Sequence, residues 1–172
     1  AVQHLVAQGC TRIAFFAPFG SLAIIQNRRN GYRQALRDSG LDIEECHVVQ
    51  CADNEKDTMM IVKDFLSTMR PDAVIGSVEK VTMQAYVACR ELNMSIPHDV
   101  KVIGFSHLQI ASLLNPSLTT ITQPAYEMGR AAATALFRTL SKKQVEVEND
   151  VIELPSVLVE RGSTLRVELE VG

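Results

Sequence analysis

The sequence contains no tryptophan, few other aromatic residues and no excess of positive charge. Nine glycines and six prolines in 172 residues are too few for a disordered or collagen-like chain. No apolar stretch approaches the roughly 20 residues that a membrane-spanning helix needs, which argues against a membrane protein. The formal net charge of -3 argues against a nucleic-acid-binding surface on this polypeptide alone. With 47% hydrophobic residues, the composition is that of a globular protein with one core or two small lobes.

The first residues lack the pattern of a secretory signal, and the chain does not begin with methionine. We therefore expect a piece of a longer cytoplasmic protein. The four cysteines form no C-x-x-C pair, so we expect reduced, mostly buried thiols rather than disulfides or zinc ligands. The histidines are scattered without the spacing of metal ligands, and we expect neither a metal nor a cofactor.

Short apolar runs alternate with helical patterns over residues 10–105. Strands are predicted at 12–17, 47–51, 73–76 and 100–105, and the first of these runs is nearly all apolar, as expected of a parallel strand buried on both faces. Between them, helices are predicted at 21–39, from Asp53 or Asn54 to 69, and at 79–93, with Ser21 as the N-cap of the first. Repeated β-α-β units predict a doubly wound α/β domain, a Rossmann-like parallel sheet covered by helices on both faces.

The rest of the chain departs from this alternation. A longer loop at 106–118 contains several apolar residues, and a short strand is predicted at 118–122. Pro124 stands where it could open a helix that continues to residue 140. A polar linker at 141–149 precedes two predicted strands, at 151–154 and 157–160, which Pro155 separates.

Ligands of open parallel sheets bind at the carboxyl ends of the strands, so the residues that follow each strand are the candidate site. They lie at 18–21, 51–54, 77–79 and 106–107, and they mix hydroxyl, carboxylate, amide and imidazole groups. Asp53 and Glu79 are either two convergent carboxylates or N-caps of the helices that follow them. The chain has no G-x-S-x-G elbow, no P-loop and no G-x-G-x-x-G motif. The residues therefore give no positive indication of catalysis.

Five segments in the right order resemble the effector-binding region of the LacI/GalR family of bacterial transcription regulators. HLVAQG at 4–9 followed by RIAF at 12–15 is similar to that family's helix–glycine–strand entry. RRNGY at 28–32 matches R-x-x-G-[FYW], and IPHDVKVIGF at 96–105 matches I-P-x-D-[VI]-x-V-[IV]-G-[FY]. PSLTTITQP at 116–124 and the closing LP…LVERGST at 154–164 match two further segments of the regulator family. Periplasmic sugar-binding proteins of the same fold usually lack these two segments.

The resemblance implies two periplasmic-binding-protein-like lobes joined by three chain crossings. Residues 1–9 would be the end of a helix of the N-terminal lobe and the first crossing, and 10–121 the C-terminal lobe. Residues 122–152 would belong to the N-terminal lobe, 153–165 would return as a strand, and 166–172 would be a tail. The DNA-binding headpiece would lie outside this chain and would contact operator DNA. The family also dimerises partly through the segment that holds Leu108, Ile110, Leu113 and Leu114, which could instead be core residues.

The resemblance also points to effector-binding positions. Arg28 stands where the family places an arginine that donates to ligand hydroxyls or a carboxylate. At two other positions this chain departs from the family: Val78-Glu79 replaces the usual Asn-Asp, and Ser106-His107 replaces Asp-Asp. We therefore name Arg28, Asp53, Val78, Glu79 and Ser106 as candidate effector-binding residues.

The departures, with Leu22 and Ile24 as an apolar rim, indicate that the effector is not a plain neutral monosaccharide or that the site binds it differently. The implied function is that of a homodimeric regulator in which a sugar or related polar metabolite closes the lobes and controls operator binding. A solute-binding protein of a sugar transport system is the alternative. An α/β enzyme with a nucleotide-like ligand is a third hypothesis, which the missing phosphate loop disfavours.

Overall fold

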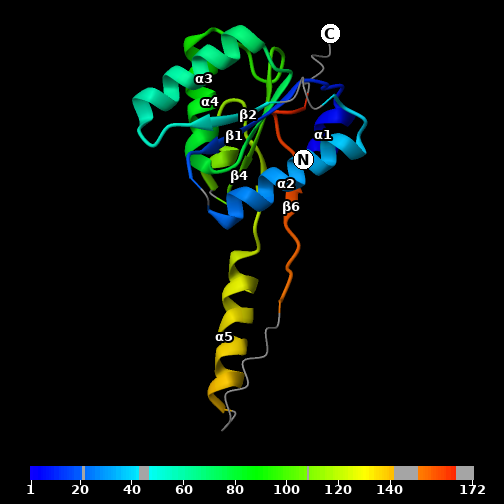
Figure 1. Ribbon diagram of the computed structural model, residues 1–172, viewed down its shortest axis with the longest axis vertical. Coiled ribbons are helices and arrows are strands. Elements are labelled where there is room, and N and C mark those ends of the chain that lie inside the picture. Colours follow the sequence, from blue (N-terminus) through cyan, green and yellow to red (C-terminus); the bar gives the residue numbers. More distant parts are fainter. Residues whose placement is uncertain (21, 43–46, 108, 142–150, 166–172) are drawn as a thin grey trace.

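The computed structural model describes residues 1–20, 22–42, 47–107, 109–141 and 151–165. Six strands form one sheet in the order β2-β1-β3-β4-β5-β6 (Figure 1). The first five pair in parallel, and β6 pairs with β5 in the antiparallel direction, with Thr122 opposite Val157. The predicted α/β class and parallel sheet are therefore confirmed. The strands are β1 Ile13–Pro18, β2 Val48–Cys51, β3 Ala73–Gly76, β4 Lys101–Phe105, β5 Thr119–Thr122 and β6 Val157–Val159.

Within the described ranges, five α-helices and one 3-10 helix accompany the sheet. They are α1 Val2–Ala7, α2 Ala23–Asp38, α3 Glu55–Met69, α4 Glu79–Glu91, the 3-10 helix η1 Gln109–Ser112 and α5 Ala125–Ser141. Of the two predicted N-caps for α3, Asn54 is the one used, because its side chain accepts a hydrogen bond from the Asp57 amide. Helix α2 begins later than predicted, after Leu22, which supplies no side-chain cap; Ser21 lies outside the described residues.

The core lies on both faces of the sheet, as the apolar strands predict. Along β1, Ile13 and Phe15 pack with α1 and α2 on one face, whereas Ala14 and Phe16 pack with α3 and α4 on the other. Helix α1 takes part in the first cluster, since its Val2 and Leu5 are buried there. Cys10, Cys51 and Cys89 are buried, as predicted, and Cys51 and Cys89 are free thiols, while Cys46 lies outside the described residues.

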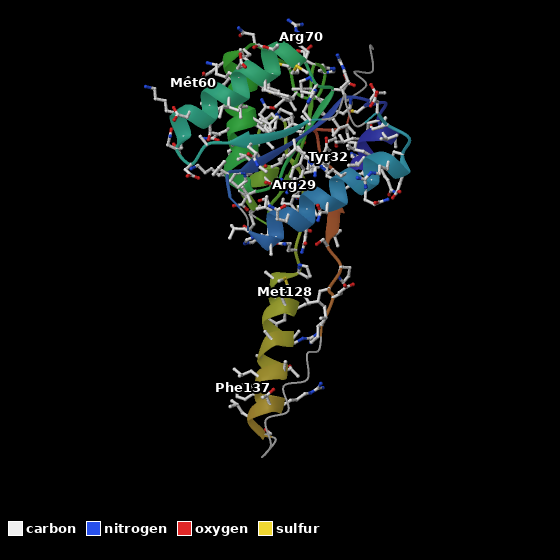
Figure 2. The ribbon with its side chains drawn as sticks, in the orientation of Figure 1. Arg29, Tyr32, Met60, Arg70, Met128 and Phe137 are labelled. Atoms are coloured by element: carbon white, nitrogen blue, oxygen red, sulfur yellow. The ribbon has the colours of Figure 1, made fainter. Side chains whose placement is uncertain are left out.

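Helix α5 projects away from the sheet and its helices (Figure 1). None of its residues is buried, although it carries large apolar side chains, among them Met128 and Phe137. Figure 2 shows Met128 near the start of α5 and Phe137 towards its end, far from the sheet. The predicted strand at 151–154 is wrong: residues 151–156 form no strand in the structure. A strand needs a neighbouring strand to accept and donate its backbone hydrogen bonds, and these residues pair with none in the described part of the chain.

The starts of β1 and β3 are tied together by one carboxylate. Asp72 accepts hydrogen bonds from the Thr11 and Arg12 amides, the Thr11 hydroxyl and the Arg12 guanidinium. Burial by itself would raise the pKa of Asp72, but hydrogen bonds from Arg12 and Thr11 outweigh it and lower the pKa to about 2.

We expect Asp72→Asn to destabilise the protein by about 1–2 kcal/mol at neutral pH, because the charged acceptor is lost. Since the pKa in the folded state lies below the ordinary value, the wild-type advantage is complete above about pH 4 and disappears as the pH falls towards 2. Urea unfolding at pH 7 and at low pH measures both effects. A stability difference that stayed constant over this range would contradict the assignment.

Candidate functional site

Three of the five predicted site residues place polar side chains at the carboxyl edge of the sheet: Arg28, Glu79 and Ser106. Strands β3 and β4 end next to each other there, so the residues that follow them, at 77–79 and at 106, come together. Helix α2, which follows β1, brings Arg28 to the same place. This edge is where open α/β sheets bind their ligands.

Two contacts fix the orientation of the Arg28 guanidinium at this edge of the sheet. Its Nη1 donates a hydrogen bond of 2.6 Å to the carbonyl oxygen of Ser77, and the guanidinium carbon lies 4.0 Å from the centroid of the Phe105 ring. This stacking is a cation–π contact, which suits the planar guanidinium. Burial lowers the pKa of Arg28 below its ordinary value. A guanidinium is not deprotonated in proteins, so the side chain keeps its charge, and its remaining N–H groups can donate to a ligand.

Glu79 and Ser106 form a second polar contact in the same edge. Glu79 is the first residue of α4, where a carboxylate is favoured by the helix dipole. The alternative prediction, in which Asp53 and Glu79 are N-caps, is wrong, because the N-cap of α3 is Asn54 and that of α4 is Val78. The Ser106 hydroxyl, which is 9% exposed, donates a hydrogen bond of 2.7 Å to Glu79 Oε1. Val78, the N-cap residue of α4, offers no side-chain hydrogen bond and packs partly buried against both core clusters.

Asp53 is placed beside these residues. It is exposed after β2, and Lys80 Nζ donates a hydrogen bond of 3.1 Å to its backbone carbonyl oxygen. This bond does not involve the Asp53 carboxylate, so the convergence of the Asp53 and Glu79 carboxylates stays a prediction.

Two residues that contribute to this site were not predicted from the sequence. Phe105 was assigned only to a strand, yet its ring supports Arg28. Ser77 accepts from Arg28 through its carbonyl, and its own fully buried hydroxyl has no hydrogen-bond partner among the described residues. The position of Phe105 at the end of a predicted strand could have indicated this role, because an aromatic ring there can reach the carboxyl edge of the sheet.

The rim of this edge is apolar, as predicted. Leu22 and Ile24, at the start of α2, are 68% and 46% exposed, and Phe19, in the connection from β1, is 67% exposed. These side chains have no neighbours that would bury them, although each has an apolar surface that water solvates poorly. The site therefore combines a small charged centre with an apolar border.

The segment predicted to contact a second copy lies apart from this edge. Ile110 and Leu113 are exposed, Leu114 is half-buried, and Leu108 lies outside the described residues. Leu114 borders a surface pocket of about 580 Å³ whose other wall is helix α4, with Met83 and Tyr86. The Tyr86 hydroxyl donates to the Pro116 carbonyl at 3.0 Å, and burial raises the pKa of Tyr86 to about 12.

Metal binding and thiol chemistry have no visible place in the described part of the chain. No three side chains of histidine, cysteine, aspartate or glutamate converge there as a metal ion would require. Burial raises the pKa of Cys51 and of Cys89 to about 11, so both thiols stay protonated at neutral pH. None of the described helices combines the length and apolar character of a membrane span.

Comparison with known proteins places the fold and the motifs in one family. The sequence model of one protein family, the periplasmic binding protein-like domain, matches residues 2–164 of this chain. The ribose operon repressor of Escherichia coli is 30% identical over 164 residues, which are 95% of this chain and 49% of the repressor. Among solved structures, the lac repressor dimer bound to operator and the anti-inducer ONPF superposes with a TM-score of 0.82 at 26% identity, covering 96% of this chain and 49% of that one.

A complex of the transcriptional regulator CelR with cellobiose has a TM-score of 0.81 at 25% identity and covers 95% of this chain and 50% of the regulator. The chain thus spans about half the length of the relatives it matches. The chain belongs to the family of periplasmic binding protein-like domains, and the relatives that it matches within this family are transcriptional regulators of the LacI type.

Proposed function

We propose that the chain is the effector-binding and dimerising part of a bacterial transcription regulator, which acts in the cytoplasm and is not an enzyme. The observation that carries the proposal is the meeting of Arg28, Glu79 and Ser106 at the ligand edge of the sheet. The names of the relatives, which are repressors and regulators, support the same role. The effector would be a sugar or a related polar metabolite, as the ribose operon repressor and the cellobiose complex suggest.

A second lobe would complete the binding site. Helix α5 leaves the sheet with its apolar side chains exposed, and the chain corresponds to about half of its relatives. We therefore propose that residues 122–152 belong to an N-terminal lobe, which would cover α5 and form the opposite wall of the site. Operator DNA would be bound by a headpiece in the same longer polypeptide. Ligand binding would favour the closed arrangement of the lobes and so change the spacing of the headpieces.

Operator binding by the full-length protein tests this proposal. Ribose, cellobiose, lactose and other neutral sugars would be added singly to the protein on DNA from its own promoter region, and the fraction of bound DNA measured by fluorescence anisotropy. We expect at least one sugar to change the affinity for DNA by about 5-fold or more, the range of ordinary allosteric coupling. Sequence-specific DNA binding that no polar metabolite alters, or an absence of such binding, would contradict the proposed function.

The apolar surface beside α4 fits a second copy of the chain. Leu113 is 80% exposed, and it lies one residue before Leu114 at the pocket lined by Met83 and Tyr86. Exposed leucines next to an apolar pocket are typical of protein interfaces. A symmetric dimer would place each loop against the partner's copy of the same surface.

We expect Leu113→Glu to weaken dimerisation of the full-length protein by about 3 kcal/mol, which is more than 100-fold, because it buries an unpaired charge in the interface. Sedimentation equilibrium measures the change in the dissociation constant. Met60→Glu, at an exposed methionine of α3, is the matched control and leaves the dimer intact. If both variants dimerised equally well, this surface would not be the dimer interface.

A further inference from the structure

One imidazole joins two parts of the chain that are far apart in sequence. His4 Nε2 lies 2.9 Å from the Thr164 hydroxyl oxygen, 160 positions later, and His4 Nδ1 lies 3.3 Å from Glu160 Oε1. Figure 1 shows α1, in blue, beside this red segment that follows β6. Because Val2 and Leu5 of α1 are part of the core, His4 fastens the returning chain to a firmly packed helix. We call the contacts of His4 with Glu160 and Thr164 the clasp.

The two nitrogens of His4 face different surroundings. Thr164 is fully buried, whereas the side chain of Glu160 is 50% exposed, and that of His4 is 9% exposed. A neutral imidazole has one N–H donor and one acceptor nitrogen, and a protonated imidazole donates from both. The effect of pH on the clasp therefore depends on which of these forms each side of the ring can accept.

The buried side can serve both forms, because its hydroxyl groups can rotate. The Thr164 hydroxyl oxygen lies 2.8 Å from that of Thr119, which lies 3.0 Å from the Arg161 carbonyl oxygen. Next to a neutral His4 with its proton on Nδ1, Thr119 donates to Thr164 and Thr164 donates to Nε2. Next to a protonated His4, Nε2 donates to Thr164, Thr164 to Thr119, and Thr119 to the Arg161 carbonyl. The buried hydrogen bonds are thus satisfied in either case.

The exposed side distinguishes the two forms. A neutral Nδ1–H group that donates to the Glu160 carboxylate makes an ordinary hydrogen bond to an anion, whereas a protonated His4 makes an ion pair, which is stronger. We propose that the clasp is a pH-sensitive contact, which holds the segment after β6 more firmly to α1 when His4 is protonated. Imidazole groups take up their second proton around pH 6.5, where a glutamate carboxylate is already ionised. The stabilising effect is therefore present below that range and is lost as the pH rises through it.

Other charged groups near α1 have contacts elsewhere or lie exposed. Helix α1 itself carries no titratable side chain besides His4. Arg161, next to Glu160 in sequence, donates to the Leu118 carbonyl at 2.7 Å and to the Thr120 hydroxyl at 2.8 Å. Helix α2 shares a core cluster with α1, and the charged residues of its second half are exposed: Arg33, Arg37 and Asp38. Within the described residues, the ion-pair partner of His4 is Glu160.

The place of the clasp gives it a regulatory meaning, which rests on the proposed function. In the proposed regulator, the chain that returns from the second lobe enters β6 at Val157, and Glu160 follows the end of this strand. Acidification would therefore strengthen the attachment of one connection between the lobes. Effector-driven closure of the lobes would then take place on a firmer base at low pH than at high pH.

A double-mutant cycle in the full-length protein, with thermal unfolding at pH 5.5 and pH 8.0, tests the clasp. The variants are His4→Gln, Glu160→Gln and the double variant, and the other histidines are present in all of them. We expect Glu160→Gln to lower the unfolding temperature by about 1–3 °C at pH 5.5, the size expected for a half-exposed ion pair. The loss should be less than half as large at pH 8.0 or in the His4→Gln background. Glu153→Gln, at an exposed glutamate before β6, is the control and should show no such dependence on pH.

The outcomes separate the clasp from the proposed function. A coupling between His4 and Glu160 that is equal at both pH values, or absent at both, would overturn the proposal, whatever the operator assay shows. If no sugar changes operator binding but the coupling appears at pH 5.5 alone, the clasp stands and only its regulatory meaning is lost. If His4→Gln does not fold, the comparison of Glu160→Gln with Glu153→Gln decides, and the same response to pH in both variants would contradict the clasp.

Discussion

Replacing Gly104 with alanine is expected to lower the free energy of unfolding by about 3 kcal/mol, because it overpacks a tight contact between β4 and α4. A Cβ atom at this position would lie 2.7 Å from Thr82 Cγ2 and 2.8 Å from Thr82 Oγ1. Thr82 is fully buried, and its hydroxyl donates to the Val78 carbonyl one turn earlier in the helix. The side chain therefore has little room to move away.

The same contact offers an internal test. Thr82→Ala removes both close atoms, and the Cβ of residue 82 would then lie 3.2 Å from the Cβ added at position 104. In the Thr82→Ala background, Gly104→Ala should therefore lower the free energy of unfolding by about half as much or less. At Gly76 an added Cβ would also lie 2.9 Å from the Thr82 Cβ and 3.0 Å from its Cα, so Thr82→Ala should rescue Gly76→Ala less well. Urea unfolding of the four-member cycle measures these differences.

Gly31→Ala is the control for the two strand glycines. It lies in α2, and an added Cβ would meet no atom within 4 Å. Alanine is favoured over glycine inside a helix, so this substitution should stabilise the protein by about 0.5–1 kcal/mol. Equal destabilisation by all three alanines would show that close packing against Thr82 is not the cause.

Arg28→Ala is expected to weaken effector binding about 30- to 100-fold, which corresponds to about 2–3 kcal/mol. The substitution removes the charged donors, and it also takes away the guanidinium that covers the Phe105 ring. Arg28→Lys keeps the charge but loses the planar stack and the forked donors, so its affinity should lie between those of the alanine variant and the wild type. Calorimetry with the sugar identified by the operator assay gives the three values.

Arg33→Ala is the matched control, since Arg33 is an exposed arginine on the same helix. It should bind the sugar as tightly as the wild type does. If Arg28→Ala and Arg33→Ala behaved alike, the ligand edge would have to be placed elsewhere. A loss of thermal stability in Arg28→Ala without the sugar would separate a folding defect from a binding defect.

Most of the sheet could be predicted from the sequence because strands β1 to β5 carry their own signal. Phe15 and Phe16 stand in a run that is apolar on both faces, and such a run fits a buried parallel strand. The predicted strand at 151–154 failed for a different reason. Its largely apolar composition gives only a propensity, whereas a strand exists through pairing with a neighbour, which these residues lack in the described chain.

The candidate site was predictable in its location but not in its contacts. Its place followed from where the strands end, and Arg28, Glu79 and Ser106 do meet there. That Ser106 donates to Glu79, 27 positions away in sequence, depends on the register of β3 and β4 and on the start of α4. The stack of Arg28 on Phe105 depends on how α2 lies over the sheet, which no local pattern encodes.

The antiparallel pair of β5 and β6 has a mechanical consequence. The chain leaves the sheet towards α5 just after Thr122 and returns just before Val157, and these two residues lie opposite each other, joined by a bond from the Thr122 hydroxyl to the Val157 carbonyl. Beyond this pair the two tethers are not bonded to each other in the described chain, because residues 151–156 form no strand. Whatever is attached to α5 is thus joined to the sheet where the outgoing and returning chains lie side by side, at the ends of β5 and β6.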